Sequence, residues 1–363
     1  MHVTVEQQND SCYLITVQTT AEETDQAIAA GVPEFLERVH ASQLKEGEDR
    51  REGLVRRFGP ERADRALSDA VMNHLLPEAL RQSGLEPACS PMPVGEPTPA
   101  DGEPFSFSAT VFVLPQLELS DYETPVAVTV ERVYASEHDV DQQLLALAAH
   151  FSTTEKSQLT GNEVRSLPAI DDEWVATVYP VPTINTVADL RAQLRTYLDR
   201  FNEDDFENRT VNAAVAALSE RLEGEAPRQV VEILGRDMIA DVEEEILANE
   251  GKALNTALKE QGVKREDFDR AMFAQARDSV MESLTLDAVF RHEGMQVSDD
   301  DIEQAIARIA STAGDEGQVL AAQASLREMG RTPQLEEVAR RLKAGQWIEA
   351  HAQVTVQVQP TDE

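Results

Sequence analysis

The side chains that most often carry out chemistry in proteins are sparse in this chain, and their spacing fits no catalytic or metal-binding pattern. The two cysteines, Cys12 and Cys89, are too few for a disulfide framework or a four-ligand zinc site. A glycine-rich phosphate loop, a Gly-Xaa-Ser-Xaa-Gly elbow and a His-Glu-Xaa-Xaa-His helix are all missing. Several histidines fall on or at the end of predicted helices without a second histidine three or four positions away: His40, His74, His138, His150 and His292. We therefore predict no catalytic residue, no metal, no cofactor, and a protein that is not an enzyme.

Three acidic runs raise the question of a calcium site: Asp171-Asp172-Glu173, Glu243-Glu244-Glu245 and Asp299-Asp300-Asp301. They lack the alternating ligands and the central glycine of an EF-hand loop. The last run follows Ser298, and a serine N-cap with acidic residues in the first turn is typical of a helix start. Binding, rather than catalysis, is the chemistry that remains.

The overall charge limits the partners. The formal net charge is −35, with 67 acidic against 32 basic residues, so a nucleic-acid phosphate backbone would be repelled and no DNA partner is expected. A strongly charged exterior suits a protein that carries apolar material without precipitating, although a solvated acidic surface explains it equally. Neither a signal peptide nor a run of about 18 apolar residues occurs, which predicts a cytoplasmic protein with no membrane partner.

The first third of the sequence predicts an α+β domain. Alternating apolar residues around the polar turn Gln7-Gln8-Asn9-Asp10 predict a hairpin, and Thr20 N-caps a helix over about 21–41. A polar loop over 42–53 is followed by a helix with Leu67, Val71 and further leucines on one face. The alternation of Phe105, Phe107, Ala109, Val111 and Val113 then predicts a returning strand.

The remainder reads as mainly helical. Residues 117–134 are extended, Ser136 starts a helix, and the polar stretch 152–169 reads as a linker. Beyond it, apolar residues keep the spacing of amphipathic helices, including Val187, Leu190, Leu194, Leu198 and Phe201. Alternating Val354, Val356 and Val358 predict one terminal strand.

Three stretches in a fixed order resemble trigger factor, the ribosome-associated bacterial chaperone family. The first is Leu75-Leu76-Pro77-Glu78-Ala79-Leu80, and the second runs from Pro104 to the segment Pro115-Gln116-Leu117-Glu118-Leu119-Ser120-Asp121-Tyr122. The third begins at Ile170-Asp171-Asp172-Glu173-Trp174 and extends to Glu293-Gly294-Met295-Gln296-Val297. The resemblance covers nearly the whole chain and implies a ribosome-binding α+β domain followed by a helical, arm-bearing domain.

One departure from the family concerns its middle domain. The family carries a peptidyl-prolyl isomerase domain of FKBP type, on the order of a hundred residues, where residues 136–169 offer a helix and a linker. The resemblance therefore implies four parts: a trigger factor N-terminal domain over 1–115, an extended connection and first helix of the C-terminal domain over 116–150, a linker over 151–169 where the isomerase domain is missing, and a helical substrate-binding domain over 170–363. Isomerase activity is not expected.

A second departure concerns the family's ribosome-docking loop, which falls on residues 43–50. The resemblance assigns Leu44, Lys45 and Gly47 to ribosome contact, but Glu46, Glu48 and Asp49 make this tip acidic and predict weakened ribosome binding. Nearby basic residues form a candidate patch for RNA or an acidic partner: Arg50, Arg51, Arg56 and Arg57. The alternative is a solvated helix face, because acidic residues alternate with them.

Promiscuous binding of apolar segments is the function that the resemblance implies. Candidate substrate contacts in the helical half are Met238, Met272, Phe273, Met281 and Met295, because methionine surfaces adapt to varied partners. For each residue taken singly, core packing is the favoured alternative. We predict an ATP-independent chaperone, a holdase, for non-native or nascent polypeptides. The alternative is a dedicated scaffold or assembly factor for one folded partner, and a homodimer is left open.

Overall fold

The computed structural model describes residues 1–45, 47–95, 97–151, 169–178, 183–311, 316–330 and 332–358. The predicted linker lies outside these residues except at its two ends, as does Glu46. The chain forms two compact units, each assembled from separate stretches: Met1–Ser120 with Leu222–Lys343, and Asp121–Arg221 with Ala344–Glu363. The predicted division at residues 115 and 169 stays a prediction.

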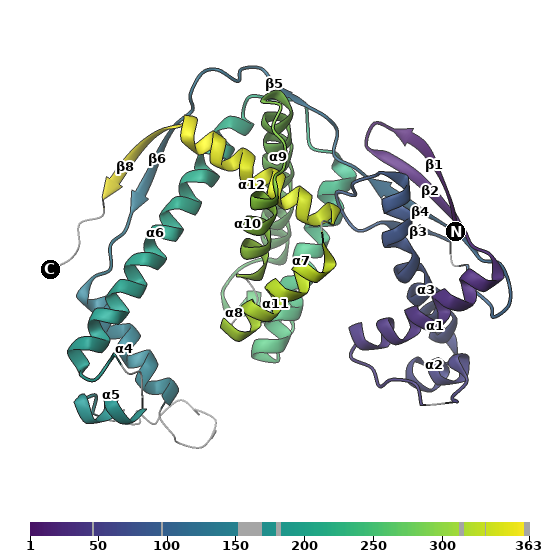
Figure 1. Ribbon diagram of the computed structural model, residues 1–363, viewed down its shortest axis with the longest axis horizontal. Helices are drawn as coiled ribbons and strands as arrows, with labels where there is room; N and C mark the ends of the chain where they lie inside the picture. The colour runs from purple at the N-terminus through teal and green to yellow at the C-terminus, as the bar shows by residue number, and fades with distance from the viewer. Residues whose placement is uncertain are drawn as a thin grey trace. The chain divides into compact units, whose positions relative to one another are not determined.

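The first unit contains a four-stranded antiparallel sheet, ordered β1, β2, β4, β3 (Figure 1). The strands are β1 (His2–Asn9), β2 (Cys12–Gln18), β3 (Met92–Val94) and β4 (Ser106–Phe112). The predicted hairpin and returning strand are confirmed. The hairpin turn lies later than predicted, because β1 still pairs with β2 at Asn9 and Cys12.

Three helices, α1 (Ala21–Arg38), α2 (Arg50–Phe58) and α3 (Pro60–Ser83), pack with this sheet around one apolar core. Thr20 caps α1 as predicted, in a capping box with Glu23. Side chains from β2, β4 and the helices fill the core, among them Ile15, Phe107, Ile28, Leu36 and Val71. The loop predicted over 42–53 is shorter than expected, because Asp49 caps α2 and starts it at Arg50.

The rest of the first unit is helical apart from a short pairing of β5 (Glu118–Leu119) with β7 (Leu222–Glu223). Its helices are α7 (Arg228–Glu250), α8 (Leu254–Glu260), α9 (Arg265–His292), α10 (Asp299–Ala310), α11 (Glu316–Met329) and α12 (Pro333–His351), whose last residues belong to the second unit. Ser298 forms the predicted capping box, with Asp301 as its partner.

The second unit combines β6 (Ala127–Arg132), α4 (Glu137–Phe151), α5 (Asp172–Val178), the long α6 (Val187–Ser219) and β8 (Gln353–Val358). Strands β6 and β8 form a two-stranded parallel sheet, and β6 packs against α6 (Figure 1). Buried side chains of α4, α5 and α6 form an apolar cluster that includes Leu144, Trp174, Val175 and Leu190. The helix predicted after Ser136 and the terminal strand are confirmed. The α+β class is thus confirmed.

Candidate functional site

The loop between α1 and α2 is held closed by Arg57. Its guanidinium donates to the carbonyl oxygens of Ser42 and Gln43, both at 2.5 Å, and to that of Gly53 at 2.7 Å. It also reaches Glu48, with 3.3 Å between Nη1 and Oε1. An arginine with several donors in a fixed plane can tie together backbone groups that are distant along the chain.

Glu48 lies inside this loop, with only 6% of its side chain exposed. Its carboxylate accepts from the backbone N–H of Lys45 at 2.7 Å and pairs with Arg56 at 2.8 Å. The Lys45 N–H, followed by the Arg57 guanidinium, lowers the pKa of Glu48 below its usual range. The expectation that Glu48 contributes an exposed negative charge to the loop tip is therefore wrong, because its carboxylate lies inside the loop and pairs with Arg56 and Arg57.

The three residues assigned to ribosome contact occupy different settings in this loop. Leu44 packs on the core of the sheet and its helices, Lys45 is exposed, and Gly47 holds a positive φ of 76° that favours glycine. Asp49 uses its carboxylate to cap α2, accepting from the N–H of Glu52. Lys45 is thus the one member of the three that presents a charge to solvent.

The four arginines of the candidate basic patch each pair with a carboxylate. Arg50 meets Asp101 at 2.9 Å, and Arg51 makes two parallel bonds to Asp64 at 2.9 and 3.1 Å. Arg56 and Arg57 pair with Glu48, as described above. This pairing is what a helix face with alternating signs would give, and the role of the patch in recognition stays a prediction.

Two of the predicted substrate contacts, Met272 and Phe273, pack between helices of the first unit. Both lie on α9 and contact the cluster formed by Ile239, Leu254 and Leu258. The ring of Phe273 rests on Gly235 of α7, where a Cβ atom would come within 2.3 Å of the ring. With Phe273 in place, the close crossing of α7 and α9 therefore needs glycine at position 235.

Met295 lies just after α9, and its backbone helps to close the C-terminus of the helix. The N–H of Met295 donates to the carbonyl oxygen of Phe290, and the N–H of Gly294 donates to the carbonyl oxygen of Arg291, both at 3.1 Å. Gly294 has a positive φ of 59°. This pair of bonds is a Schellman motif, which closes a helix through a left-handed residue. Met238 and Met281 are half-buried on α7 and α9. The role of these five residues in substrate binding stays a prediction.

The large apolar side chains that do face solvent include two aromatic residues of α6. Tyr197 is 60% exposed and Phe201 is 58% exposed, and their spacing of four places them on one face of the helix. Phe201 was expected to face inward with Leu190, Leu194 and Leu198, but the apolar cluster takes only the leucines. Periodicity alone does not separate Phe201 from the buried leucines, and Tyr197 was not among the predicted contacts.

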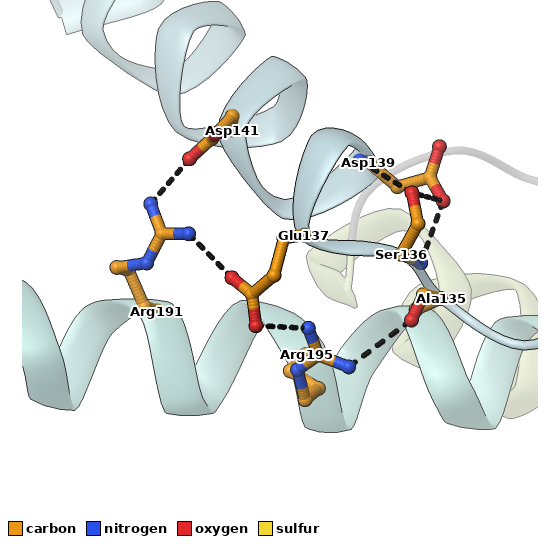
Figure 2. Close-up of polar contacts among 7 residues, drawn as sticks. All are labelled: Ala135, Ser136, Glu137, Asp139, Asp141, Arg191 and Arg195. Atoms are coloured by element: carbon orange, nitrogen blue, oxygen red, sulfur yellow. Dashed lines mark hydrogen bonds and ion pairs between the residues drawn. The ribbon is translucent and has the colours of Figure 1, made fainter. Parts of the chain in front are cut away.

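Two arginines of α6 fasten the start of α4 to it (Figure 2). Arg191 and Arg195 both donate to Glu137, each at 2.6 Å, and Arg191 also pairs with Asp141. The hydrogen bond from Arg191, followed by the charge of Arg195, lowers the pKa of Glu137. Arg195 also donates to the carbonyl of Ala135 at 3.0 Å, just ahead of the helix. These ion pairs hold the start of α4 against α6. Tyr197 and Phe201 remain exposed to solvent.

A cavity of about 450 Å³ in the first unit is lined by several charged side chains. Arg340 pairs with Glu86 at 3.0 Å and with Asp287 at 3.1 Å. Arg341 pairs with Asp287 and, at 2.6 Å, with Glu337. Burial raises the pKa of Glu337. These charges compensate one another across the cavity. Among the described residues, no group of three or more histidines, cysteines or carboxylates is placed to hold a metal, and no helix is long and apolar enough to span a membrane.

Two family models match most of the chain. The model of the bacterial trigger factor protein matches residues 1–147, and the model of the trigger factor C-terminus matches residues 186–350. The chain belongs to the trigger factor family. This family of chaperones was the one predicted from the sequence, and that prediction is confirmed. Residues 148–185, which contain the predicted linker, lie between the two matches.

Individual relatives match the chain to different extents. Trigger factor from Chromohalobacter salexigens is 31% identical over 170 residues, covering 45% of this chain and 37% of the relative. Trigger factor from Alkaliphilus metalliredigens is 27% identical over 147 residues, or 33% of its length, so the chain spans only about a third of these two relatives. Trigger factor from Mycobacterium leprae is 24% identical over 94% of this chain and 87% of the relative.

One solved chain matches this one over most of its length. It comes from work on promiscuous substrate recognition in folding and assembly activities of the trigger factor chaperone. It covers 96% of this chain and 98% of its own, with 16% identity and a TM-score of 0.39.

Proposed function

We propose that this chain is an ATP-independent holdase that binds unfolded or nascent polypeptides through exposed apolar side chains of the second unit. The observation that carries the proposal is the pair Tyr197 and Phe201 on α6, both more than half exposed. Large aromatic side chains bury much apolar area at little entropic cost, and they are enriched where proteins bind partners. The net charge of −35 keeps a complex with a sticky client in solution.

The expected strength of these contacts fits a release step that needs no nucleotide. Fully burying a large apolar side chain is worth about 1.5–3 kcal/mol, so covering the exposed part of one ring contributes on the order of 1–2 kcal/mol. Two such anchors alone would give no better than about millimolar affinity. A client is therefore held by several weak contacts and leaves when it folds and withdraws its apolar segments.

We also propose that the chain has no prolyl isomerase activity. An independent isomerase domain needs on the order of a hundred residues, whereas residues 148–185 are all that separates the two family matches. A protease-coupled assay on an Ala-Pro peptide tests this. We expect uncatalysed isomerisation, which takes tens to hundreds of seconds at 25 °C, and clear acceleration would contradict the proposal.

Ribosome binding is proposed to be weakened. The support is the closed loop in which the one carboxylate of Glu48 pairs with both Arg56 and Arg57, and in which Lys45 is the one charged residue of the three assigned to ribosome contact. Few free cations mean few contacts to a phosphate backbone. Co-sedimentation with ribosomes at low salt tests this, with Lys45→Ala as the variant. Tight binding that Lys45→Ala does not change would place the docking surface elsewhere.

The holdase proposal is tested by client breadth. The full chain, added to several unrelated chemically denatured proteins, is expected to suppress light scattering with or without ATP. The competing function is a scaffold for one folded partner. Failure to protect any of the clients, together with one stoichiometric protein in a pull-down from cell extract, would favour that alternative.

A further inference from the structure

The parallel sheet of the second unit has only two strands, and the backbone groups on the outer edge of β8 can be named. The N–H of Gln353 donates to the carbonyl of Val126 at 2.8 Å, so Gln353 points its backbone groups at β6. Alternate residues of a parallel strand point their groups to opposite sides. Val354, Val356 and Val358 therefore direct their N–H and C=O groups away from β6. Within the described part of the chain, no strand pairs with that edge of β8.

The side chains of the same three valines form an apolar row on the face of the sheet that carries Val128 and Val130. Val354 pairs with Val128 and Val356 with Val130, so each pair lies on one face of the sheet. Val128 and Val130 are buried on β6, which packs against α6. On β8 the row emerges into solvent, with Val356 45% and Val358 59% exposed. A two-stranded sheet is marginal by itself, and an open edge strand such as β8, with valines along one face, is a template for a further strand.

Acidic groups lie near the start of β8. Glu349, close to the end of α12, has its pKa raised by burial and by the nearby carboxylate of Glu207 on α6. Glu207 is exposed. The exposed carboxylate of Glu207 is complementary to a basic residue on an incoming chain at this end of the strand.

We propose that the outer edge of β8 receives an extended segment of a client polypeptide as a third strand, one that alternates β-branched residues and carries lysine or arginine at the end that lies beside the start of β8. The inference rests on the proposed function, since it names how the chain holds a non-native polypeptide. Backbone hydrogen bonds would supply sequence-tolerant affinity, and the valine row would select apolar side chains at every second position. Tyr197 and Phe201 would act as separate apolar anchors.

A labelled peptide of sequence Lys-Val-Thr-Val-Thr-Val-Lys is the probe, and fluorescence anisotropy with the full chain is the measurement. Two further peptides are N-methylated, one at its valines and the other at its threonines. An N-methyl group removes a donor and blocks one edge of the peptide, so one isomer is expected to keep its affinity and the other to lose it about tenfold or more. Loss in the valine isomer indicates an antiparallel added strand, and loss in the threonine isomer a parallel one. Equal binding of all three peptides, or no binding of the unmodified one, would overturn the proposal.

Variants of Val356 locate the site. Val356→Pro removes a donor that points away from β6 and leaves the β6 pairing in place, as proline on an edge strand does. It is expected to weaken peptide binding about tenfold. Val356→Ala, which keeps the N–H and only shortens one side chain of the valine row, is expected to weaken binding less. A thermal melt of each variant confirms folding. Unchanged binding to Val356→Pro would overturn the assignment to β8. If glutamates in place of the peptide lysines leave the affinity unchanged, the basic character of the occupant is wrong.

These results are separable from the holdase proposal. If the unmodified chain protects several denatured clients from aggregation but does not bind the peptide, strand addition is wrong and the holdase proposal stands. If the chain protects no client, the holdase proposal itself fails.

Discussion

Arg57 and Glu48 close the loop that carries the family's ribosome-contact positions. Their side chains meet inside it, where Arg57 also binds three backbone carbonyls and Glu48 accepts from the N–H of Lys45. From the sequence alone, both residues would be assigned to the surface. In the structure, they stabilise the inside of the loop instead. Changing Glu48→Lys is therefore expected to open the loop and not to restore a basic tip.

Glu48→Gln is predicted to loosen this loop. Glutamine keeps the size of the side chain but loses the charge that holds Arg56 and Arg57, and a charge-assisted bond is roughly twice as strong as a neutral one. Limited trypsin digestion should cleave after Lys45 several-fold faster than in the unmodified chain. Asp101→Asn is the matched control, because it removes the exposed partner of Arg50 and should leave the rate unchanged. Equal rates for all three proteins would show that the loop is held by other contacts.

The start of α10 is predicted to depend on pH. Burial raises the pKa of Asp301, but hydrogen bonds from Lys343 and Ser298 outweigh this effect and lower it to about 2. The folded pKa lies below the unfolded value of about 3.9, so the stabilisation is complete above about pH 4 and is lost as pH falls toward 2. Asp301→Asn should cost on the order of 1–2 kcal/mol at pH 7.

Thermal melts across this range test the prediction. The difference in Tm between the unmodified chain and Asp301→Asn should shrink as pH falls from 4 to 2. Asp300→Asn, an exposed neighbour in the same first turn, is the control and should change Tm little at any pH. A constant difference for Asp301→Asn from pH 7 down to pH 2 would mean that its charge contributes nothing.

Gly235→Ala is predicted to destabilise the crossing of α7 and α9, although alanine normally favours a helix by about 1 kcal/mol. The added Cβ would overlap the ring of Phe273, and overpacking costs about 1–3 kcal/mol. In a Phe273→Ala background the same change should become neutral or stabilising, because the ring is gone. Denaturant unfolding of the four proteins measures the coupling. An equal effect of Gly235→Ala in both backgrounds would contradict the packing described.

Local elements were predictable from the sequence because their signals are local. The capping boxes at Thr20 and Ser298 and the alternation in β4 and β8 involve residues a few positions apart. The partner of β8 was not predictable, since β6 lies more than 200 residues earlier and alternation alone does not name a partner. The interleaving of the two units follows from such long-range pairings.

Site residues were harder to predict than elements, because periodicity does not say which apolar residue the core leaves out. Phe201 continues the spacing of Leu194 and Leu198 but faces solvent, while Met272 and Phe273 read as an adaptable surface and are packed between helices. Glu48 shows the same limit for charge. An acidic residue beside a glycine reads as solvated, and only the fold brings Arg56 and Arg57 to it.

The most direct test of client binding through the exposed face of α6 is suppression of aggregation by the variant Tyr197→Ser with Phe201→Ser. Light scattering of a denatured client is measured at an equimolar amount of each protein, with Leu320→Ser as the control, because Leu320 on α11 is 61% exposed. The double variant should lose most of the protection, the control should keep it, and protection by the unmodified chain should fall only slightly as salt rises. Full protection by the double variant, or its abolition by moderate salt in the unmodified chain, would contradict the proposal.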